Sequence, residues 1–190
     1  MTSGKSIEDI TRYYITQDLT GDDIQTLIGK QPIEYSQLQN MSFSQLLPDA
    51  SPFQVILLQT KAANNGHWVA LWADSKNINY WDSLGMGMPD TYKSYTPFDK
   101  QYPPLLANLL ATDPRRRPII ANYKDYQQWS GQVSTCGRWS GLRIKLRDLS
   151  NDEFDRIFEG NSGLLRNRDF VATILTLLSL HDIRKVFGFS

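Results

Sequence analysis

The chain has 190 residues, of which 41% are hydrophobic and 21% are charged, an ordinary composition for a globular domain. Its 20 basic and 20 acidic residues cancel, so overall charge gives no argument for binding nucleic acid or an anionic membrane surface. No apolar run reaches membrane-spanning length, and residues 1–5 lack the apolar core of a signal peptide. We therefore expect a single domain over residues 1–190, with an N-terminal helical region (1–50), a central core (51–150) and C-terminal helices (151–190).

The first part of the chain reads as short helices and connections. Ser6 followed by acidic residues is typical of a capped helix start, and a second short helix is expected over residues 20–28. Residues 53–59 then form a compact run of β-favouring side chains after Pro52, which predicts a strand.

The middle of the chain predicts a β-hairpin. Two β-rich runs, residues 67–72 and 78–82, are joined by the polar turn 73–77. Residues 85–104 are rich in Gly, Pro and Tyr and predict a loop that could serve as a lid or wall, and a helix is expected over residues 105–111.

The last part of the chain predicts one more strand and two helices. The strand is expected over residues 119–128, and the first helix over residues 137–149. The final helix, residues 169–180, is apolar nearly all round and should be buried. This order of elements indicates an α+β fold, a small central mixed β-sheet packed by helices.

Cys136 is the only cysteine, so it cannot form a disulfide within the chain, and a reducing environment is expected. Two interpretations remain, an inert buried thiol or a nucleophile. Thr135 and Gly137 flank the cysteine at the start of a predicted helix. Unpaired N–H groups and the positive end of the helix dipole would stabilise a thiolate there.

A nucleophilic cysteine needs a general base and a group that orients that base. Of the two histidines, His181 follows the last apolar helix and reads as a surface or helix-capping residue. His67 instead begins the first arm of the hairpin, and Asp82 ends the second arm fifteen residues later. Because paired strands bring these ends together, the Asp82 carboxylate could hold the tautomer of His67.

Donors for a developing oxyanion could come from a glutamine cluster upstream of the cysteine, which contains Gln127, Gln128 and Gln132. One glutamine N–H together with the backbone N–H of Cys136 would form an oxyanion hole. The residues alone leave the nucleophile and the inert thiol both open.

Three short blocks carry a resemblance to a known family. They are residues 66–70 (Gly-His-Trp-Val-Ala), residues 80–85 (Tyr-Trp-Asp-Ser-Leu-Gly), and residues 135–139 (Thr-Cys-Gly-Arg-Trp) after the glutamine cluster. Together they resemble the adenovirus maturation protease and the ubiquitin-like-protein-specific cysteine proteases. They are most similar to the maturation proteases of virophages, Maverick/Polinton elements and large DNA viruses.

The resemblance implies a role for each matched residue. Cys136 would be the nucleophile at a helix N-terminus, His67 the general base, and Asp82 the group that orients His67. Trp68 would wall the substrate site.

The glutamine is where this chain departs from the family pattern. The family commonly places it six positions before the cysteine, where this chain has Ser130. Gln128, eight positions before the cysteine, is the favoured oxyanion donor because the loop Ser130-Gly131 can supply the extra length. Gln132 is the second choice, and Gln127 lies nine positions before.

The implied activity is that of a monomeric cysteine endopeptidase that cleaves viral capsid or core precursor proteins through a thioester. It would act in the virion or the host cytoplasm. The alternatives are a protease of ubiquitin-like modifiers and a catalytically inactive structural homologue. No cofactor is expected, and one cysteine with two distant histidines supports no zinc site.

Some family members are activated by a peptide attached through a second cysteine, which this chain lacks. Any activator should therefore be a non-covalent peptide or DNA. The basic run Arg115-Arg116-Arg117 reads as a solvated loop and is the only local opening for DNA.

Overall fold

The computed structural model describes residues 6–62, 65–88, 104–159 and 163–180. A five-stranded sheet in the order β1-β2-β3-β4-β5 forms its centre. Strands β2, β3 and β4 are antiparallel neighbours, whereas the edge strands β1 and β5 run parallel to β2 and β4. The predicted α+β fold with a mixed sheet is therefore confirmed. The strands are β1 (Ile33–Glu34), β2 (Phe53–Ala62), β3 (Asn65–Ala73), β4 (Ile78–Trp81) and β5 (Ile119–Ala121).

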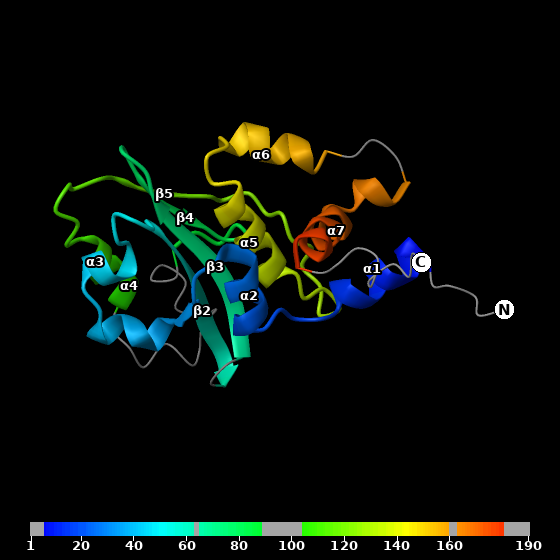
Figure 1. The fold of residues 1–190 in the computed structure, drawn as a ribbon, viewed down its shortest axis with the longest axis horizontal. Helices are drawn as coiled ribbons and strands as arrows, with labels where there is room; N and C mark the ends of the chain where they lie inside the picture. The colour runs from blue at the N-terminus through cyan, green and yellow to red at the C-terminus, as the bar shows by residue number, and fades with distance from the viewer. Residues whose placement is uncertain (1–5, 63–64, 89–103, 160–162, 181–190) are drawn as a thin grey trace.

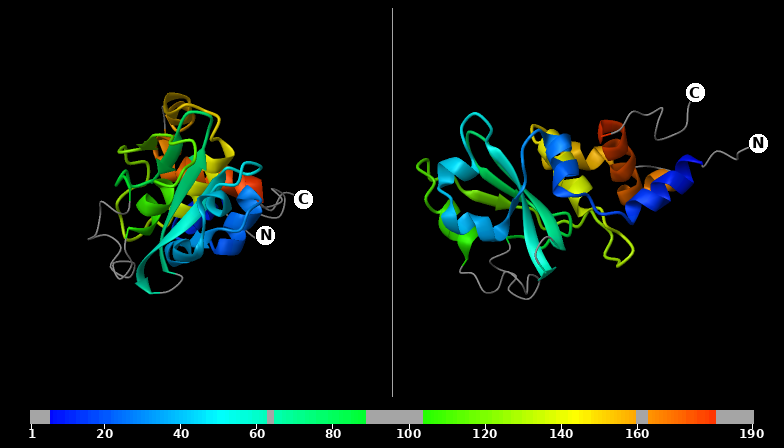
Figure 2. Two further views of the ribbon diagram at one scale, coloured as in Figure 1. Left: turned by 90° about the vertical axis from the view of Figure 1, so that its left-hand side faces the viewer. Right: turned by 60° about the horizontal axis from the view of Figure 1, so that its bottom comes forward.

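Helices cover both faces of the sheet (Figures 1 and 2). One face is covered by η1 (Tyr35–Asn40), α3 (Phe43–Leu46) and α4 (Leu105–Leu110). The other is covered by α2 (Gly21–Ile28) and α5 (Cys136–Lys145), with α6 (Asn151–Ile157) and α7 (Arg168–Leu180) beside α5. The remaining helices are α1 (Ile7–Ile15), which packs on α7, and η4 (Gly163–Arg166).

The sheet divides its side chains between two cores, because successive residues of a strand point to opposite faces. The aliphatic core lies under η1, α3 and α4, and the aromatic core lies under α5. The sheet contributes Ile56, Leu58, Val69, Leu71 and Ile78 to the aliphatic core. It contributes Val55, Ala70, Trp72 and Trp81 to the aromatic core, where they meet Trp139, Phe154 and Phe158.

Trp139 of α5 is the centre of the aromatic core. Its ring centroid lies 4.5 Å from that of Phe158, 5.6 Å from Tyr126 and 6.2 Å from Trp81. The guanidinium of Arg143 is buried against this core, 4.5 Å from the ring centre of Trp72. Burial lowers the pKa of Arg143 to about 10, so the group remains a cation at neutral pH.

The hairpin and both late helices were predicted close to their observed bounds, but the strand expected over residues 119–128 was too long. β5 ends at Ala121. The next residue, Asn122, turns the chain because its side-chain amide donates to the carbonyls of Asp82 (2.7 Å) and Lys124 (3.0 Å). The predicted loop 85–104 lies largely outside the described residues, as does His181.

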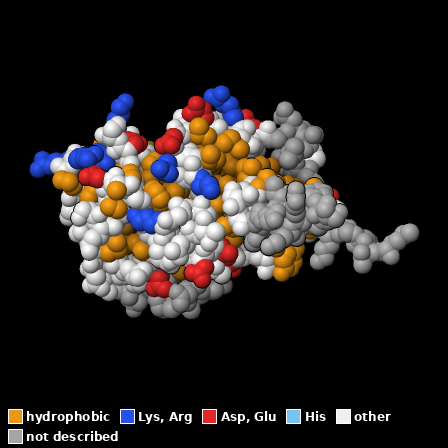
Figure 3. All heavy atoms as spheres, in the orientation of Figure 1, with side chains coloured by type: hydrophobic (Ala, Val, Ile, Leu, Met, Phe, Trp, Pro, Cys, Tyr) orange, Lys and Arg blue, Asp and Glu red, His pale blue; other side chains and the backbone are white. Residues whose placement is uncertain are grey.

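Figure 3 shows one face of the molecule, on which basic and acidic side chains are scattered among neutral ones. None of the helices in the described part of the chain is both long enough and apolar enough to cross a membrane.

Candidate active site

β3 carries His67 to the edge of the site through an unusually close approach to β2. His67 pairs with Leu58, and Gly66 pairs with Gln59. A Cβ atom on Gly66 would lie 1.9 Å from the Leu58 carbonyl oxygen, so this position accepts only glycine. The Gly-His sequence is therefore a requirement of the strand pairing as well as of the site.

His67 and Asp82 form a buried pair. The distance between His67 Nε2 and Asp82 Oδ1 is 2.6 Å, and the two residues are 4% and 1% exposed. Oδ1 also accepts from the backbone N–H of Leu84 at 2.8 Å. Asn122 bonds both backbone groups of Asp82, since its Oδ1 accepts from Asp82 N and its Nδ2 donates to Asp82 O, each at 2.7 Å. The carboxylate is thus fixed from several sides.

Cys136 completes the series on the other side of the imidazole, as the buried first residue of α5. His67 makes a side-chain hydrogen bond to Cys136. Because Nε2 is engaged by Asp82, Nδ1 is the ring nitrogen that serves the sulfur.

The electrostatics of this series favour a protonated imidazole. Burial alone lowers the pKa of His67, but the charge and hydrogen bond of Asp82 outweigh burial, and Cys136 acts in the same direction. The pKa of His67 rises to about 10 as a result. At neutral pH the histidine is therefore an imidazolium beside the sulfur, the arrangement that supports a thiolate nucleophile.

Trp68 joins β3 to the start of α5. A Cβ atom on Gly137 would lie 3.0 Å from Leu19 Cβ and 3.2 Å from Trp68 Cδ1, so glycine after the cysteine allows this close packing. Trp68 Nε1 donates to the Leu19 carbonyl, and the hydroxyl of Ser140 donates to the Trp68 carbonyl at 2.9 Å. The nucleophile helix is thereby held against the strand that carries His67.

Residues 15–19, the last residue of α1 and the turn and connection after it, lie beside the site. Their alternate carbonyl groups, those of Ile15, Gln17 and Leu19, accept hydrogen bonds from Ser134 N (2.8 Å), Arg138 Nη1 (2.6 Å) and Trp68 Nε1 (3.2 Å). Burial lowers the pKa of Arg138 to about 10, and the nearby charge of Cys136 opposes that change. Arg138 is thus a second buried cation close to the sulfur.

The three glutamines lie in different environments. Gln127 is buried, and the hydroxyl of Ser83 donates to its Oε1 at 2.9 Å, while its Nε2 donates to the Val133 carbonyl at 3.3 Å. The side chains of Gln128 and Gln132 are exposed. The structure therefore brings Gln127, rather than the favoured Gln128, into the buried part of the site.

These residues open onto a cleft of about 500 Å³, which His67, Cys136, Gln127 and Gln128 help to line. Trp68 lines a neighbouring hollow of about 640 Å³ that shares Asp18 and Gly66 with the cleft. Cys136 lines the cleft, and the neighbouring hollow adjoins the cleft at Asp18 and Gly66.

Sequence reasoning missed the residues that support the site, namely Ser83, Asn122 and Asp169. Asn122 lies inside the strand predicted over residues 119–128, and nothing in the sequence indicates its hydrogen bonds to Asp82. Asp169 is 2% exposed. A lone acid at the start of a helix predicted to be buried is a signal that could have found it.

The basic run lies in a loop, as expected, and Arg115 and Arg116 are exposed, but Arg117 is not solvated. Arg117 pairs with Asp113 at 2.9 Å, and the side chains are 10% and 2% exposed. Arg115 reaches Asp49 at 3.1 Å on the surface. Within the described ranges, no group of three or more His, Cys, Asp or Glu side chains could hold a metal ion.

Comparison with known proteins gives a relative from a virophage. No family model matches the chain. The chain is 27% identical over 175 residues to "Uncharacterized protein V9" of Sputnik virophage, which covers 87% of this chain and 98% of V9. The chain is similar to a virophage protein. This agrees with the virophage resemblance predicted from the sequence blocks.

Two solved structures match at a TM-score of 0.42. One is the SUMO protease Ulp1 with its catalytic cysteine oxidised to a sulfinic acid, with 17% identity, 93% of this chain covered and 85% of that chain. The other is the central domain of the Lpg1148 protein from Legionella pneumophila, with 12% identity, 85% of this chain covered and 98% of that chain. At these scores neither match decides the chemistry, which rests on the side chains of the site.

Proposed function

We propose that this chain is a cysteine endopeptidase that cleaves viral capsid or core precursor proteins. The observation that carries the proposal is the buried series Asp82, His67 and Cys136, which ends at a helix N-terminus and opens onto a cleft. An inert thiol needs neither a buried imidazolium nor a carboxylate behind it, and isolating such charges from water without use costs free energy.

The reaction follows from the positions of these groups. The Cys136 thiolate attacks the carbonyl carbon of the scissile peptide bond, and the carbonyl electrons move onto oxygen. As the tetrahedral intermediate collapses, the C–N bond breaks and His67 gives its Nδ1 proton to the leaving amine. A water molecule, deprotonated by His67, then hydrolyses the thioester and releases the carboxylic acid, and His67 is left protonated beside the thiolate.

We assign the oxyanion hole to the backbone N–H of Cys136 and the side-chain amide of Gln127. The Ser83 hydroxyl fixes the Gln127 amide through Oε1, which turns Nε2 toward the loop before the cysteine. A primary amide carries two N–H donors, so one remains for the oxyanion while the other bonds Val133. Gln127 thus replaces Gln128 in this role.

The substrates come from the resemblance of the sequence blocks, which implies precursor proteins cut at small, often Gly-containing motifs. The similarity to a virophage protein supports a viral setting, in the virion or the host cytoplasm. If the chain needs an activator, a non-covalent peptide or DNA fits, because Cys136 is the only thiol.

The test is cleavage of purified capsid precursor by the wild type and by Cys136→Ala. We expect cleavage by the wild type alone. Equal cleavage by both proteins, or none by the wild type with DNA and candidate peptides added, would contradict the proposal. Cleavage confined to a ubiquitin- or SUMO-fluorophore conjugate would move the chain to the modifier-specific proteases.

The oxyanion assignment predicts different outcomes for two neighbouring glutamines. Gln127→Ala should lower kcat by about 10²- to 10³-fold, the usual effect of losing one oxyanion donor. Gln128→Ala is the matched control and should leave kcat near the wild-type value, since its side chain is exposed. The reverse ranking in steady-state kinetics would return the role to Gln128.

A further inference from the structure

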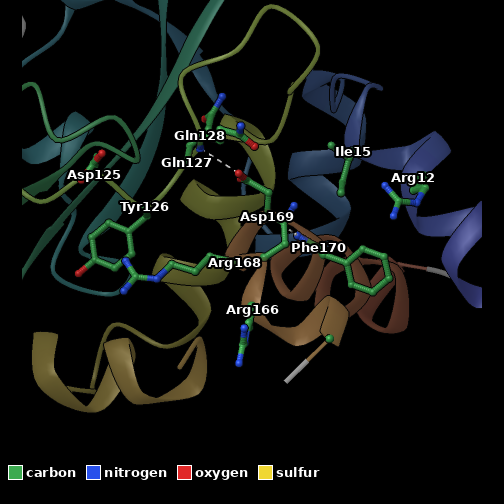
Figure 4. Close-up of a pocket in the computed structure, with 12 residues that line it drawn as sticks. Arg12, Ile15, Asp125, Tyr126, Gln127, Gln128, Arg166, Arg168, Asp169 and Phe170 are labelled. Carbon is green, nitrogen blue, oxygen red and sulfur yellow. Dashed lines mark hydrogen bonds between the residues drawn. The ribbon is translucent and has the colours of Figure 1, made fainter. Parts of the chain in front are cut away.

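Asp169, the second residue of α7, places a buried carboxylate behind the proposed oxyanion hole. Figure 4 shows its side chain pointing from α7 toward the Gln127–Gln128 turn, with the hydrogen bond to this turn dashed. The carboxylate accepts three hydrogen bonds: from Thr135 Oγ1 at 2.5 Å, Trp139 Nε1 at 2.7 Å and Gln128 N at 2.8 Å. Both oxygens of a carboxylate accept hydrogen bonds, whereas an amide of the same shape has an NH2 group in place of one oxygen. Only the carboxylate can therefore accept from all three donors.

The bond to Thr135 controls the entry of the chain into the nucleophile helix. Thr135 occupies the N-cap position of α5, where a hydroxyl usually bonds the N–H groups of the first turn. Its side chain makes no such bond, and the hydroxyl donates to Asp169 instead. The N–H groups of the first turn are therefore left without this capping acceptor. The backbone N–H of Cys136, one proposed oxyanion donor, follows directly from the residue that Asp169 holds.

The bond to Gln128 N controls the other proposed donor. The backbone N–H of Gln127 donates to the Ser83 carbonyl at 2.9 Å, and that of Gln128 donates to Asp169 at 2.8 Å. The peptide that bears the Gln127 side chain is thus clamped between β4's end and α7. Its amide can therefore keep one position as charge develops in the cleft.

We infer that Asp169 is a positioning residue that holds both halves of the oxyanion hole in register. The inference rests on the proposed function and extends it to a residue from the C-terminal helix. The carboxylate of Asp169 bonds Thr135, Trp139 and Gln128, which lie beside the proposed oxyanion donors. We therefore assign it to the oxyanion hole and not to the Cys136–His67 pair. Loss of the carboxylate should therefore weaken oxyanion stabilisation while the thiolate stays reactive.

The experiment compares two reactions of Cys136 in the full chain. Acylation by p-nitrophenyl acetate transfers the acetyl group to sulfur through an oxyanion and releases nitrophenolate. Alkylation by iodoacetamide displaces iodide at a saturated carbon and forms no oxyanion. For Asp169→Asn we expect acylation to fall about 10- to 100-fold and the alkylation rate, with its pH profile, to stay unchanged.

Thr173→Val controls for damage to the fold, and two substitutions of Thr135 test the same inference independently. Thr173→Val removes an equally buried hydroxyl that bonds the backbone carbonyl of Asp169, not its carboxylate, and should change neither reaction. Thr135→Val should lower acylation alone, and Thr135→Ser, which keeps the hydroxyl, should restore it. The Thr135 pair decides the question if Asp169→Asn does not fold.

The outcomes separate this inference from the proposed function. If Cys136→Ala and the wild type release nitrophenolate at equal rates, the proposed function fails and the inference fails with it. If the wild type is acylated and Asp169→Asn or Thr135→Val matches it, only the role of Asp169 is overturned. A parallel fall of acylation and alkylation in these variants would also overturn it, because Asp169 would then support the whole site.

Discussion

The face of the sheet under η1, α3 and α4 is packed mainly by Leu, Ile and Val and carries a buried ion pair, Asp113–Arg117, whereas the face under α5 buries aromatic rings together with several charged groups. Aliphatic contacts have little directionality, so many side chains of similar volume can satisfy them. Asp169, Arg138 and Arg143 instead each require particular partners at particular angles. The comparison shows that most interactions with strict geometric requirements lie on the face from which the site is built.

This difference has a physical use. The Cys136–His67 pair and the proposed oxyanion donors must keep their places to within fractions of an ångström for acyl transfer. Hydrogen bonds such as those from Thr135 and Trp139 to Asp169 fix direction as well as distance. The aliphatic core only has to supply burial, which amounts to about 25 cal/mol per Å² of apolar surface.

The largest effect is expected from a substitution in the site that leaves the side chains of both cores unchanged. Asp82→Asn removes the charge behind His67 but keeps the shape, so the acylation rate of Cys136 should fall about 10²- to 10⁴-fold. The free energy of unfolding should also fall, because Asp82 stabilises the buried imidazolium of His67. The measurement is nitrophenolate release alongside urea unfolding.

Leu71→Ala in the aliphatic core is the opposite case. It should cost about 2–5 kcal/mol of unfolding free energy, while the folded fraction acylates at the wild-type rate. A folded Leu71→Ala protein with a strongly reduced rate would show that the aliphatic core also shapes the site.

The next effect compares conservative substitutions in the two cores. Leu46→Met in the aliphatic core should cost less than about 1.5 kcal/mol, because volume and polarity are kept. Trp139→Phe should cost about 2–4 kcal/mol, because it leaves a gap and removes a hydrogen bond to Asp169. Denaturant unfolding measures both values, and equal costs would remove the proposed contrast between the cores.

A last effect concerns pH, where the two faces should lose stability at opposite ends of the scale. The pKa of His67 is raised from 6.5 to about 10, because Asp82 and Cys136 outweigh burial. Its contribution to stability is therefore complete below pH 6.5 and lost as the pH rises through about 10.

On the aliphatic face, Arg117 lies over the ring of Phe43 and bonds Asp113. The hydrogen bond from Arg117 outweighs burial and lowers the pKa of Asp113 from 3.8 to about 2. This contribution is present above pH 3.8 and is lost as the pH falls through about 2. In the wild type, the free energy of unfolding should fall at both alkaline and acidic pH. His67→Gln should remove the alkaline fall, and Asp113→Asn should remove the acidic fall. A variant that changed the opposite limb would contradict the assignment.

The pairing of His67 with Asp82 could be predicted because a hairpin is a local structure, with both residues at the ends of arms that the sequence pattern marks clearly. The start of a helix at Cys136 could be predicted equally well. The glutamine was not, because spacing along the chain does not say which backbone N–H groups will bond Ser83. Both Tyr126 N and Gln127 N donate to that one carbonyl, and this sets which glutamine turns inward.

Contacts between distant parts of the chain also lay beyond the sequence. Asp169 lies 41 residues after Gln128 and 34 after Thr135, and no local pattern couples them. Likewise, the strand predicted to reach residue 128 ends at Ala121 because Asn122 bonds the end of β4. At these positions, contacts with residues distant in sequence determine the structure and outweigh local propensity.

Residues 15–19 and Asp169 brace Cys136 from the two sides of it in the sequence, one far before the cysteine and one after it. A ribosome makes the first of these supports before Cys136 and the second after it. A growing polypeptide that already contains the cysteine still lacks the carboxylate that holds Thr135 and the turn at Gln128. Full assembly of the site therefore requires Asp169, which is made 33 residues after Cys136, so synthesis of the cysteine alone does not complete the site.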